Sequence, residues 1–161
     1  MDDKQLALKA LEFSKNAWAP YSGFHVGAAV LLDDGTIIGG NNQENQAYPL
    51  GSCAERVAVN TARAGCPTRR IVAIAIASPD STVPVSPCGG CREVLAEAVR
   101  AQGGADIRVV MADGKAAQLR VAMATELLPY AFELQEPHDY CDVRVQGRNV
   151  RGYALPTAFS K

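Results

Sequence analysis

Two helical segments of this sequence begin with cysteine, and this shared feature limits how the chain can fold. Cys53 opens a helical stretch of about 53–64, and Cys88 and Cys91 lie in the first turn of a second stretch of about 88–101. Cysteines three positions apart lie on one face of a helix. If the three thiols hold one metal ion, the N-termini of the two helices must converge.

Three thiolates leave open one of the four tetrahedral positions of zinc, and an open position for water is typical of a catalytic zinc site. The free N–H groups and the partial positive charge of a helix N-terminus favour thiolate over thiol. Glu55 follows Cys53 by two residues. As a fourth ligand it would fill the open position, so we interpret it as a general acid and base beside the bound water. Arg56 and Arg92 directly follow the two cysteine motifs, and we interpret them as donors that moderate the negative charge of the thiolates.

A closed structural zinc site is the alternative for the same cysteines. A C-x-x-C pair alone is typical of zinc knuckles and of redox pairs, and structural zinc has four protein ligands. The other residues that could supply a fourth ligand are Cys66, Cys141, His25 and His138. Glu55 alone would be typical of a solvated helix surface, and only its neighbour Cys53 favours a role in chemistry.

The composition favours a single domain that acts on a small molecule. The chain has 161 residues, 48% of them hydrophobic, which is enough for one core. Its net charge is −1 and its 16 basic residues are scattered, so the basic patch of a nucleic-acid binder is missing. The acidic start Met1-Asp2-Asp3-Lys4 and the amphipathic sequence after it argue against a signal peptide or a membrane span. We expect a cytoplasmic protein whose five cysteines are thiols and metal ligands rather than disulfides.

Helical and extended segments alternate along the chain, which predicts a layered α/β sandwich. A first helix has apolar residues at helical spacing, and Pro20 closes it; these apolar residues are Leu6, Ala10, Phe13 and Ala17. A β-hairpin follows, from 26–32 to 36–39. The other expected elements are strands at 71–77, 107–111 and about 117–121, and a short helix through 125–128. Glycines close the two cysteine-bearing helices: Gly65, in a left-handed C-cap, and Gly103-Gly104.

Several motifs together resemble the small homotetrameric zinc-dependent cytidine deaminases, in order and in spacing. They are Phe24-His25-Val26-Gly27-Ala28-Ala29, Asn42-Gln43-Glu44-Asn45, Cys53-Ala54-Glu55-Arg56, Pro87-Cys88-Gly89-Gly90-Cys91-Arg92 and Leu127-Leu128-Pro129-Tyr130-Ala131-Phe132. The resemblance covers about residues 5–133, so we expect a cytidine deaminase domain over 1–133 and a tail of unassigned structure over 134–161. It implies a three-layer α/β sandwich with a mixed five-stranded sheet, and a homotetramer whose active sites are shared between subunits.

The resemblance implies hydrolytic deamination of cytidine and 2′-deoxycytidine to uridine and 2′-deoxyuridine, in pyrimidine salvage. Cys53, Cys88 and Cys91 would hold one zinc ion per subunit, and a zinc-bound hydroxide would attack C4 of the cytosine ring. Glu55 would take a proton from the bound water and deliver protons to N3 and to the departing ammonia.

The resemblance also implies how a nucleoside is held. Asn42 and Glu44 match the ribose contacts of the family, and an amide and a carboxylate can together fix a sugar hydroxyl group. The further contacts that it implies are Phe24 in the base pocket, Ala54 at the substrate, Phe132 of a neighbouring subunit over the ring, and Tyr48 at a site that subunits share. Without the resemblance, the aromatic residues would be expected in packing, and Asn42 and Glu44 in a turn.

One departure and two alternatives stay open. Gln46 stands near the substrate loop where members of the family often have alanine. A blasticidin-type nucleoside-analogue deaminase would keep zinc and Glu55 but would need a different sugar loop, and Asn42 and Glu44 favour cytidine. A non-enzymatic, zinc-stapled interaction domain would require a fourth protein ligand.

Overall fold

A single mixed sheet organises the domain. The computed structural model describes residues 1–133 and, for the backbone, 140–145 and 148–153. Within 1–133 the strand order is β2-β1-β3-β4-β5. The strands are β1 (Gly27–Leu32), β2 (Ile37–Asn41), β3 (Ile71–Ala77), β4 (Arg108–Ala112) and β5 (Leu119–Met123). Only the β3–β4 pair of this sheet is parallel, so the expected mixed five-stranded sheet is confirmed.

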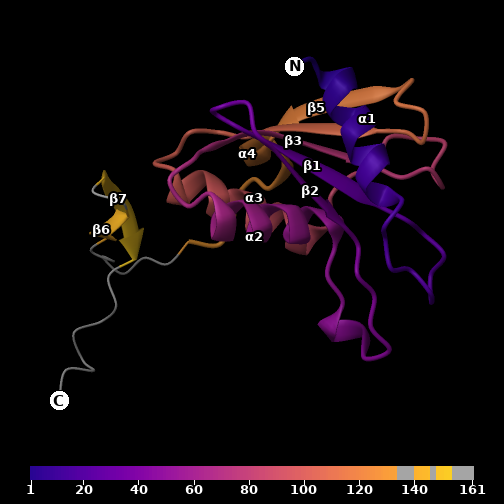
Figure 1. Ribbon diagram of the computed structural model, residues 1–161, viewed down its shortest axis with the longest axis horizontal. Coiled ribbons are helices and arrows are strands. Elements are labelled where there is room, and N and C mark those ends of the chain that lie inside the picture. Colours follow the sequence, from indigo (N-terminus) through magenta and orange to yellow (C-terminus); the bar gives the residue numbers. More distant parts are fainter. Residues whose placement is uncertain (134–139, 146–147, 154–161) are drawn as a thin grey trace.

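Helices connect and cover these strands. They are α1 (Asp3–Ser14), α2 (Ala54–Gly65), α3 (Gly89–Ala101) and α4 (Ala124–Leu127), with a 3-10 turn η1 (Tyr48–Leu50). Parallel strands need a crossover connection, and α3 supplies it between β3 and β4. Figure 1 shows α1 on one side of the sheet and α2 and α3 on the other, which is the expected three-layer sandwich.

The two faces of the sheet carry side chains of different size. In β3, Ala73, Ala75 and Ala77 pack with α1, whereas Ile74 and Ile76 belong to the core under α2 and α3. Successive strand residues point to opposite faces, so this alternation places small side chains beneath α1. The larger core therefore lies on the α2 and α3 side, where the cysteine-bearing helices begin.

The first helix ends earlier than the sequence predicted. Asp2 caps it, because its carboxylate accepts the Gln5 N–H at 2.8 Å. The helix stops at Ser14, and the prediction that it runs to Ala17 and is closed by Pro20 is wrong. The physical reason is a tertiary one: the Trp18 N–H donates to the Asn42 carbonyl at 2.9 Å, so this part of the chain pairs with residues after β2 instead.

The second helix ends without the predicted left-handed glycine. Gly65 is the last helical residue, and its φ is not positive. The Cys66 N–H still donates to the Ala62 carbonyl at 2.8 Å, and the chain leaves the helix through Cys66 with a φ of −131°. At the end of α3, by contrast, Gly103 and Gly104 have φ of 76° and 83°, which suits glycine.

The remaining elements lie close to their predicted positions. β5 begins at Leu119, two residues later than expected, and α4 (Ala124–Leu127) begins and ends one residue before the predicted short helix through 125–128. In the tail, where the sequence predicted no element, β6 (Tyr140–Val145) pairs antiparallel with β7 (Arg148–Tyr153). His138 lies outside the described residues. None of the helices in the described part of the chain has the length and apolar character that a bilayer crossing requires.

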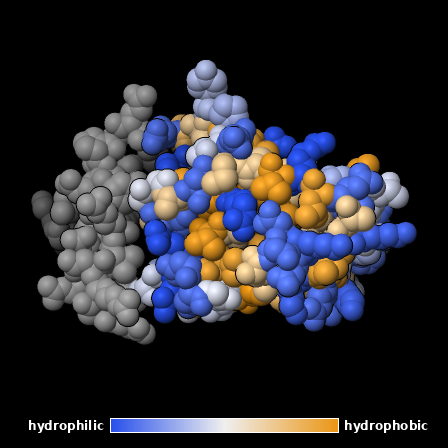
Figure 2. All heavy atoms as spheres, turned by 90° about the horizontal axis from the view of Figure 1, so that it is seen from above, coloured by the Kyte–Doolittle hydropathy of each residue, from blue (hydrophilic) through white to orange (hydrophobic). Residues whose placement is uncertain are grey.

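Apolar side chains also reach the surface. On the face that Figure 2 shows, apolar residues lie between hydrophilic ones rather than in one continuous patch. Exposed apolar side chains on the helices and strands include Leu8, Val72, Leu119 and Val121. Scattered exposed apolar residues are common on monomer surfaces, so we assign no site to this face.

Candidate functional site

The three predicted cysteine ligands meet at the beginning of two helices. Cys53 is the N-cap residue of α2, Cys88 is the N-cap residue of α3, and Cys91 lies in the first turn of α3. Both N-cap residues are extended and leave the helix amides without a side-chain cap. The three Sγ atoms all lie within 4.8 Å of one another. The predicted convergence of two helix N-termini is therefore confirmed.

The spacing of the sulfur atoms fits one zinc ion. Zn–S bonds of about 2.3 Å in a tetrahedron require sulfur atoms about 3.8 Å apart. The Cys53 and Cys88 Sγ atoms are 3.8 Å apart, and those of Cys88 and Cys91 are 3.5 Å apart. The cluster is therefore already close to the size that zinc needs, and within the described residues it supplies three of the four tetrahedral ligands.

The surroundings of the sulfur atoms favour thiolate at Cys53. The hydrogen bond with the Cys91 side chain is the main cause that lowers the pKa of Cys53 to about 5, against the opposing effect of burial. The same hydrogen bond, together with burial, raises the pKa of Cys91. Metal binding requires deprotonated thiols, so a bound cation would favour thiolate at all three cysteines.

The predicted fourth-ligand candidates that the structure describes lie elsewhere. Within the described residues, the group that could hold a metal consists of Cys53, Cys88 and Cys91. Cys66 follows the last residue of α2, at the opposite end of the helix from Cys53. The ring of His25 is bonded to Asp80. The side chain of Cys141 and the whole of His138 lie outside the described residues.

Glu55 lies buried beside the cysteine cluster. Its position in the first turn of α2 leaves it only 5% exposed. Burial is the main cause that raises the pKa of the Glu55 carboxyl, and a hydrogen bond with the Cys91 side chain acts against it. Burial with a raised pKa is typical of carboxyl groups that act as general acids and bases.

The two arginines make different contacts from each other. Arg56 Nη2 lies 3.9 Å from Cys53 Sγ and donates to the Gly51 carbonyl at 3.0 Å, so its guanidinium group is next to a sulfur atom of the cluster. Arg92 instead donates through Nε to the Pro87 carbonyl at 2.9 Å and through Nη1 to the Leu127 carbonyl at 3.2 Å. These two hydrogen bonds of Arg92 fix the chain before Cys88 rather than a sulfur atom.

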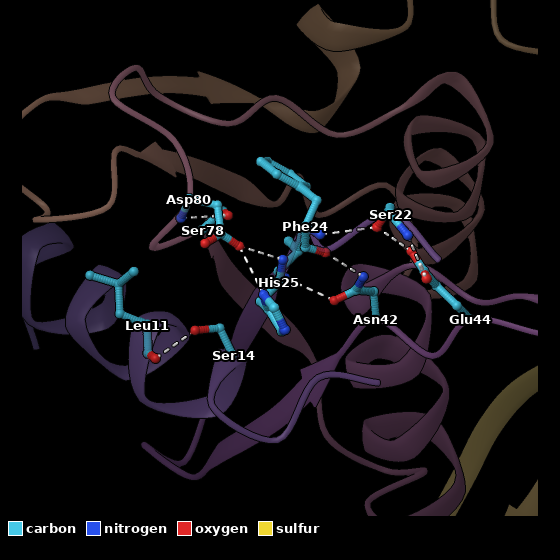
Figure 3. Close-up of polar contacts among 10 residues, drawn as sticks. Leu11, Ser14, Ser22, Phe24, His25, Asn42, Glu44, Ser78 and Asp80 are labelled. Carbon is cyan, nitrogen blue, oxygen red and sulfur yellow. Dashed lines mark hydrogen bonds and ion pairs between the residues drawn. The ribbon is translucent and has the colours of Figure 1, made fainter. Parts of the chain in front are cut away.

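Asn42 and Glu44 hold the chain that precedes β1. The Asn42 amide accepts from the Val26 N–H at 2.8 Å and donates to the Phe24 carbonyl at 2.8 Å. Glu44 accepts the N–H groups of Tyr21 and Ser22 at 2.9 and 3.1 Å, and also the Ser22 hydroxyl group. Figure 3 shows both side chains on the same side of this segment. The hydrogen bond from Ser22 is the main cause that lowers the pKa of Glu44.

The other predicted substrate residues are mostly accessible. Phe24 is 37% exposed, Phe132 is 70% exposed, and Tyr48 is 72% exposed, with its ring 5.8 Å from that of Tyr21. Gln46 is exposed as well. Ala54 is fully buried under the sheet. The structure therefore brings Glu55 to the cysteines and Asn42 to Phe24, and it leaves Phe132 on the surface of the subunit.

Sequence reasoning missed the partner of His25. The Asp80 carboxylate accepts the His25 N–H at 2.7 Å and contacts Nδ1 of the ring at 2.9 Å. These residues are separated by 55 positions, and neither hydrophobic periodicity nor a motif connects them. Ser22 was also missed: its hydroxyl group accepts the Phe24 N–H at 3.0 Å and donates to Glu44, 22 positions away.

Comparison with known proteins shows the family. Residues 1–102 match the family described as the cytidine and deoxycytidylate deaminase zinc-binding region. The chain is 40% identical over 139 residues to the cytidine deaminase of Halalkalibacterium halodurans, over 86% of this chain and 100% of that protein. The chain belongs to the cytidine deaminase family.

Solved structures agree with this membership. The cytidine deaminase from Burkholderia pseudomallei superposes with a TM-score of 0.74 at 38% identity, over 82% of this chain and 100% of that one. The cytidine deaminase from Mycobacterium tuberculosis superposes with a TM-score of 0.68 at 35% identity, over 83% of this chain and 99% of that one. This chain is therefore a cytidine deaminase enzyme with the fold of its relatives, and its three-cysteine cluster fits the zinc ion of the family.

Proposed function

We propose that this deaminase hydrolyses cytidine and 2′-deoxycytidine to uridine and 2′-deoxyuridine, as a step of pyrimidine salvage. The observation that carries the proposal is the buried Glu55 carboxyl beside three convergent thiols, which can supply three of the four ligands of zinc. A carboxyl group with no ligand role, placed next to a site for water, is what hydrolytic deamination needs. We place the enzyme in the cytoplasm, because a reducing compartment protects three closely spaced thiols from oxidation.

Glu55 is the proposed acid and base of the reaction. A zinc ion, when bound, supplies the Lewis acidity that makes a water molecule nucleophilic at neutral pH. Glu55 takes one proton from the attacking water and gives it to N3 of the base. It then takes the second proton from the oxygen now bonded to C4 and gives it to the amino group, which leaves as ammonia. Its raised pKa suits this role, since the group must hold a proton at one stage and lack it at another. Arg56 keeps negative charge stable at Cys53 by its contact with the sulfur atom.

Asn42 and Glu44 are the proposed contacts of the sugar. Each already holds the loop before β1, but neither is saturated: an amide can make two bonds through each end, and a carboxylate can accept about four. The Asn42 amide makes one hydrogen bond through its oxygen and one through its nitrogen, and the Glu44 carboxylate accepts three hydrogen bonds. The remaining capacity can receive a sugar hydroxyl group. The negative charge of Glu44 also favours a nucleoside over a nucleoside phosphate.

The base is proposed to lie between aromatic residues and the first turn of α2. Phe24 is partly exposed next to Asn42, which suits one wall of a pocket for a flat ring. Because the Ala54 side chain is buried, its contact with the substrate comes from the backbone of the helix N-terminus, where amide groups lack intrahelical partners.

We propose a homotetramer in which neighbouring subunits complete each site. Large aromatic side chains stay strongly exposed in the subunit, namely Trp18, Tyr48, Tyr130 and Phe132. Exposed aromatic residues of this kind are typical of surfaces that another chain covers. Phe132 of one subunit would then lie over the base bound by another, and Tyr48 would lie at the shared boundary.

Ultraviolet-monitored turnover by the zinc-loaded protein tests the function. We expect loss of cytidine and 2′-deoxycytidine absorbance, with slower turnover of deoxycytidylate and of free cytosine. Glu55→Gln serves as the inactive control. Turnover of blasticidin S without turnover of cytidine would favour the nucleoside-analogue alternative. No turnover of any of these, together with four protein ligands at zinc, would favour the interaction domain.

A further inference from the structure

The segment before β1 is held almost entirely by side chains. All six backbone N–H groups from Tyr21 to Val26 have an acceptor, and five of the six donate to a side-chain oxygen. The exception is Gly23, whose N–H donates to the Ala19 carbonyl at 3.0 Å. A segment outside the sheet ladder needs such partners, because unpaired backbone groups are costly when water is excluded. The position of Phe24 therefore depends on a small set of oxygens.

Asp80 is the member of this set that comes from a different part of the fold. Glu44 and Asn42 follow β2, and Ser22 lies in the segment itself. Asp80 lies in the connection from β3 to α3, the same connection that leads to Cys88. Its Oδ2 atom receives the His25 N–H at 2.7 Å and lies 2.9 Å from His25 Nδ1. Figure 3 shows Asp80 and Asn42 approaching the segment from opposite sides of His25.

The contacts around His25 fix three consecutive residues. Asn42 binds the Phe24 carbonyl and the Val26 N–H, and Asp80 binds the N–H between them. Asp80 is itself oriented by its own N–H, which donates to the Ser78 hydroxyl group at 3.2 Å, and Ser78 is fully buried. The Asp80 carboxylate thus joins the segment before β1 to the connection from β3 to α3, directly beside Phe24 of the proposed pocket.

The exposed ion pair between His25 and Asp80 would not by itself position the segment. The side chains of His25 and Asp80 are 42% and 38% exposed, and exposed pairs contribute little to stability. The backbone contact is the stronger argument, because Asp80 accepts the His25 N–H whatever the charge of the ring. Its loss frees one peptide group next to Phe24 without removing anything from the core.

We propose that Asp80, with His25, is a positioning residue that sets the place of Phe24 and thereby the affinity of the enzyme for its nucleoside. This rests on the proposed function, in which Phe24 lines the base pocket. Neither residue is expected to touch the reacting atoms. The loss of the Asp80 contact should therefore affect substrate binding rather than the chemical step, so KM should change while kcat changes little.

Three variants test the proposal in the zinc-loaded enzyme. Asp80→Ala removes the acceptor, and we expect KM for cytidine to rise about 5- to 10-fold with kcat within about twofold. Asp80→Asn keeps a side-chain oxygen and should restore most of the affinity. His25→Leu keeps the backbone N–H and removes only the ring contact, so it should have the smaller effect, about two- to threefold. If Asp80→Ala fails to fold, His25→Leu and Asp80→Asn still test the proposal.

Asp34→Ala is the matched control. Asp34 also accepts a backbone N–H, that of Thr36 at 3.0 Å, and pairs with Arg69 at 3.1 Å, but it lies in the turn at the opposite end of β1. We expect the KM of the Asp34→Ala enzyme for cytidine to stay at the wild-type value. Hydrogen exchange of residues 21–26 should quicken in Asp80→Ala and stay unchanged in Asp34→Ala.

The outcomes separate this inference from the proposed function. Absence of cytidine turnover in the wild-type enzyme overturns the proposed function itself. A wild-type enzyme that turns over cytidine, with an Asp80→Ala variant of unchanged KM, overturns only the positioning role. A loss of zinc or a fall in kcat equal to that in kcat/KM also overturns it, since a general structural defect would then explain the result.

Discussion

Gly40 of β2 lies directly against the first turn of α2. A Cβ atom at Gly40 would stand 2.6 Å from the Ala54 carbonyl oxygen and nearer still to the Ala58 nitrogen, closer than such atoms can approach. The missing side chain therefore lets the helix lie on the sheet at the distance that places Cys53 and Glu55 in the site. Both contacts involve helix backbone, which cannot move aside as a flexible side chain could.

Gly40→Ala should destabilise the fold and weaken zinc binding. Overpacking of this kind costs about 1–3 kcal/mol, or more where backbone must shift. Thermal unfolding and competition with a zinc chelator measure the two effects. Gly65→Ala is the control at the other end of α2: it has open space around it and an ordinary backbone conformation, so stability should stay the same or rise. A tolerated Gly40→Ala would show that the close approach does not position α2.

Zinc should bind through three sulfur ligands and one lighter atom. The reason is the cluster of Cys53, Cys88 and Cys91, which leaves a fourth position open. X-ray absorption spectroscopy counts the ligands directly, and Cys88→Ala should lose most of the zinc. Four sulfur ligands, or full zinc content in Cys88→Ala, would contradict the assignment.

Glu55→Gln should abolish most turnover while zinc content and fold stay intact. The amide nearly preserves the shape of the side chain but cannot move protons, and the loss should be at least about 10²-fold. Initial rates with cytidine, zinc analysis and circular dichroism give the three measurements. Near-normal turnover in this variant would remove Glu55 from the mechanism.

Activity should depend on assembly through Phe132. Phe132→Ala should weaken cytidine binding, whereas Phe132→Tyr, which keeps the ring, should not; stacking is worth about 0.5–1.5 kcal/mol beyond buried area. If Phe132→Ala is severely impaired, mixing it with Glu55→Gln subunits after dissociation and reassembly should restore some activity, because hybrid sites are intact. A fully active monomer in light scattering would rule out shared sites.

Acid should weaken the hold of Glu44 on the segment before β1. Its pKa is lowered in the folded protein, mainly by the Ser22 hydroxyl group and also by the Tyr21 and Ser22 N–H groups. Folding therefore gains from this carboxylate above its unfolded pKa of about 4.3, and the gain is lost as pH falls from there through the folded pKa. The stability difference between wild type and Glu44→Gln, measured by denaturant unfolding at several pH values, should shrink below about pH 4.3. A difference that does not change with pH would contradict this linkage.

The zinc site was more predictable than some element boundaries, for a local reason. Ligand spacing and helix N-termini are properties of short segments, so the sequence alone was enough to join Cys53, Cys88 and Cys91 into one zinc site. The end of α1 could not be located, because the backbone of Trp18 pairs with residues after β2. The C-cap prediction at Gly65 was wrong because glycine permits a left-handed turn without requiring one.

The sequence by itself determined the alternation of strands and helices, the position of the zinc ligands at two helix starts, and membership of a family. Those features follow from periodicity, spacing and motifs along the chain. Only the tertiary structure decided that Gly40 lies against Ala54, that Arg92 binds the Leu127 carbonyl, and that Asp80 accepts the His25 N–H. Contacts of this kind join residues far apart in the chain, and they depend on the distance between packed layers and on the course of loops, which local patterns do not encode.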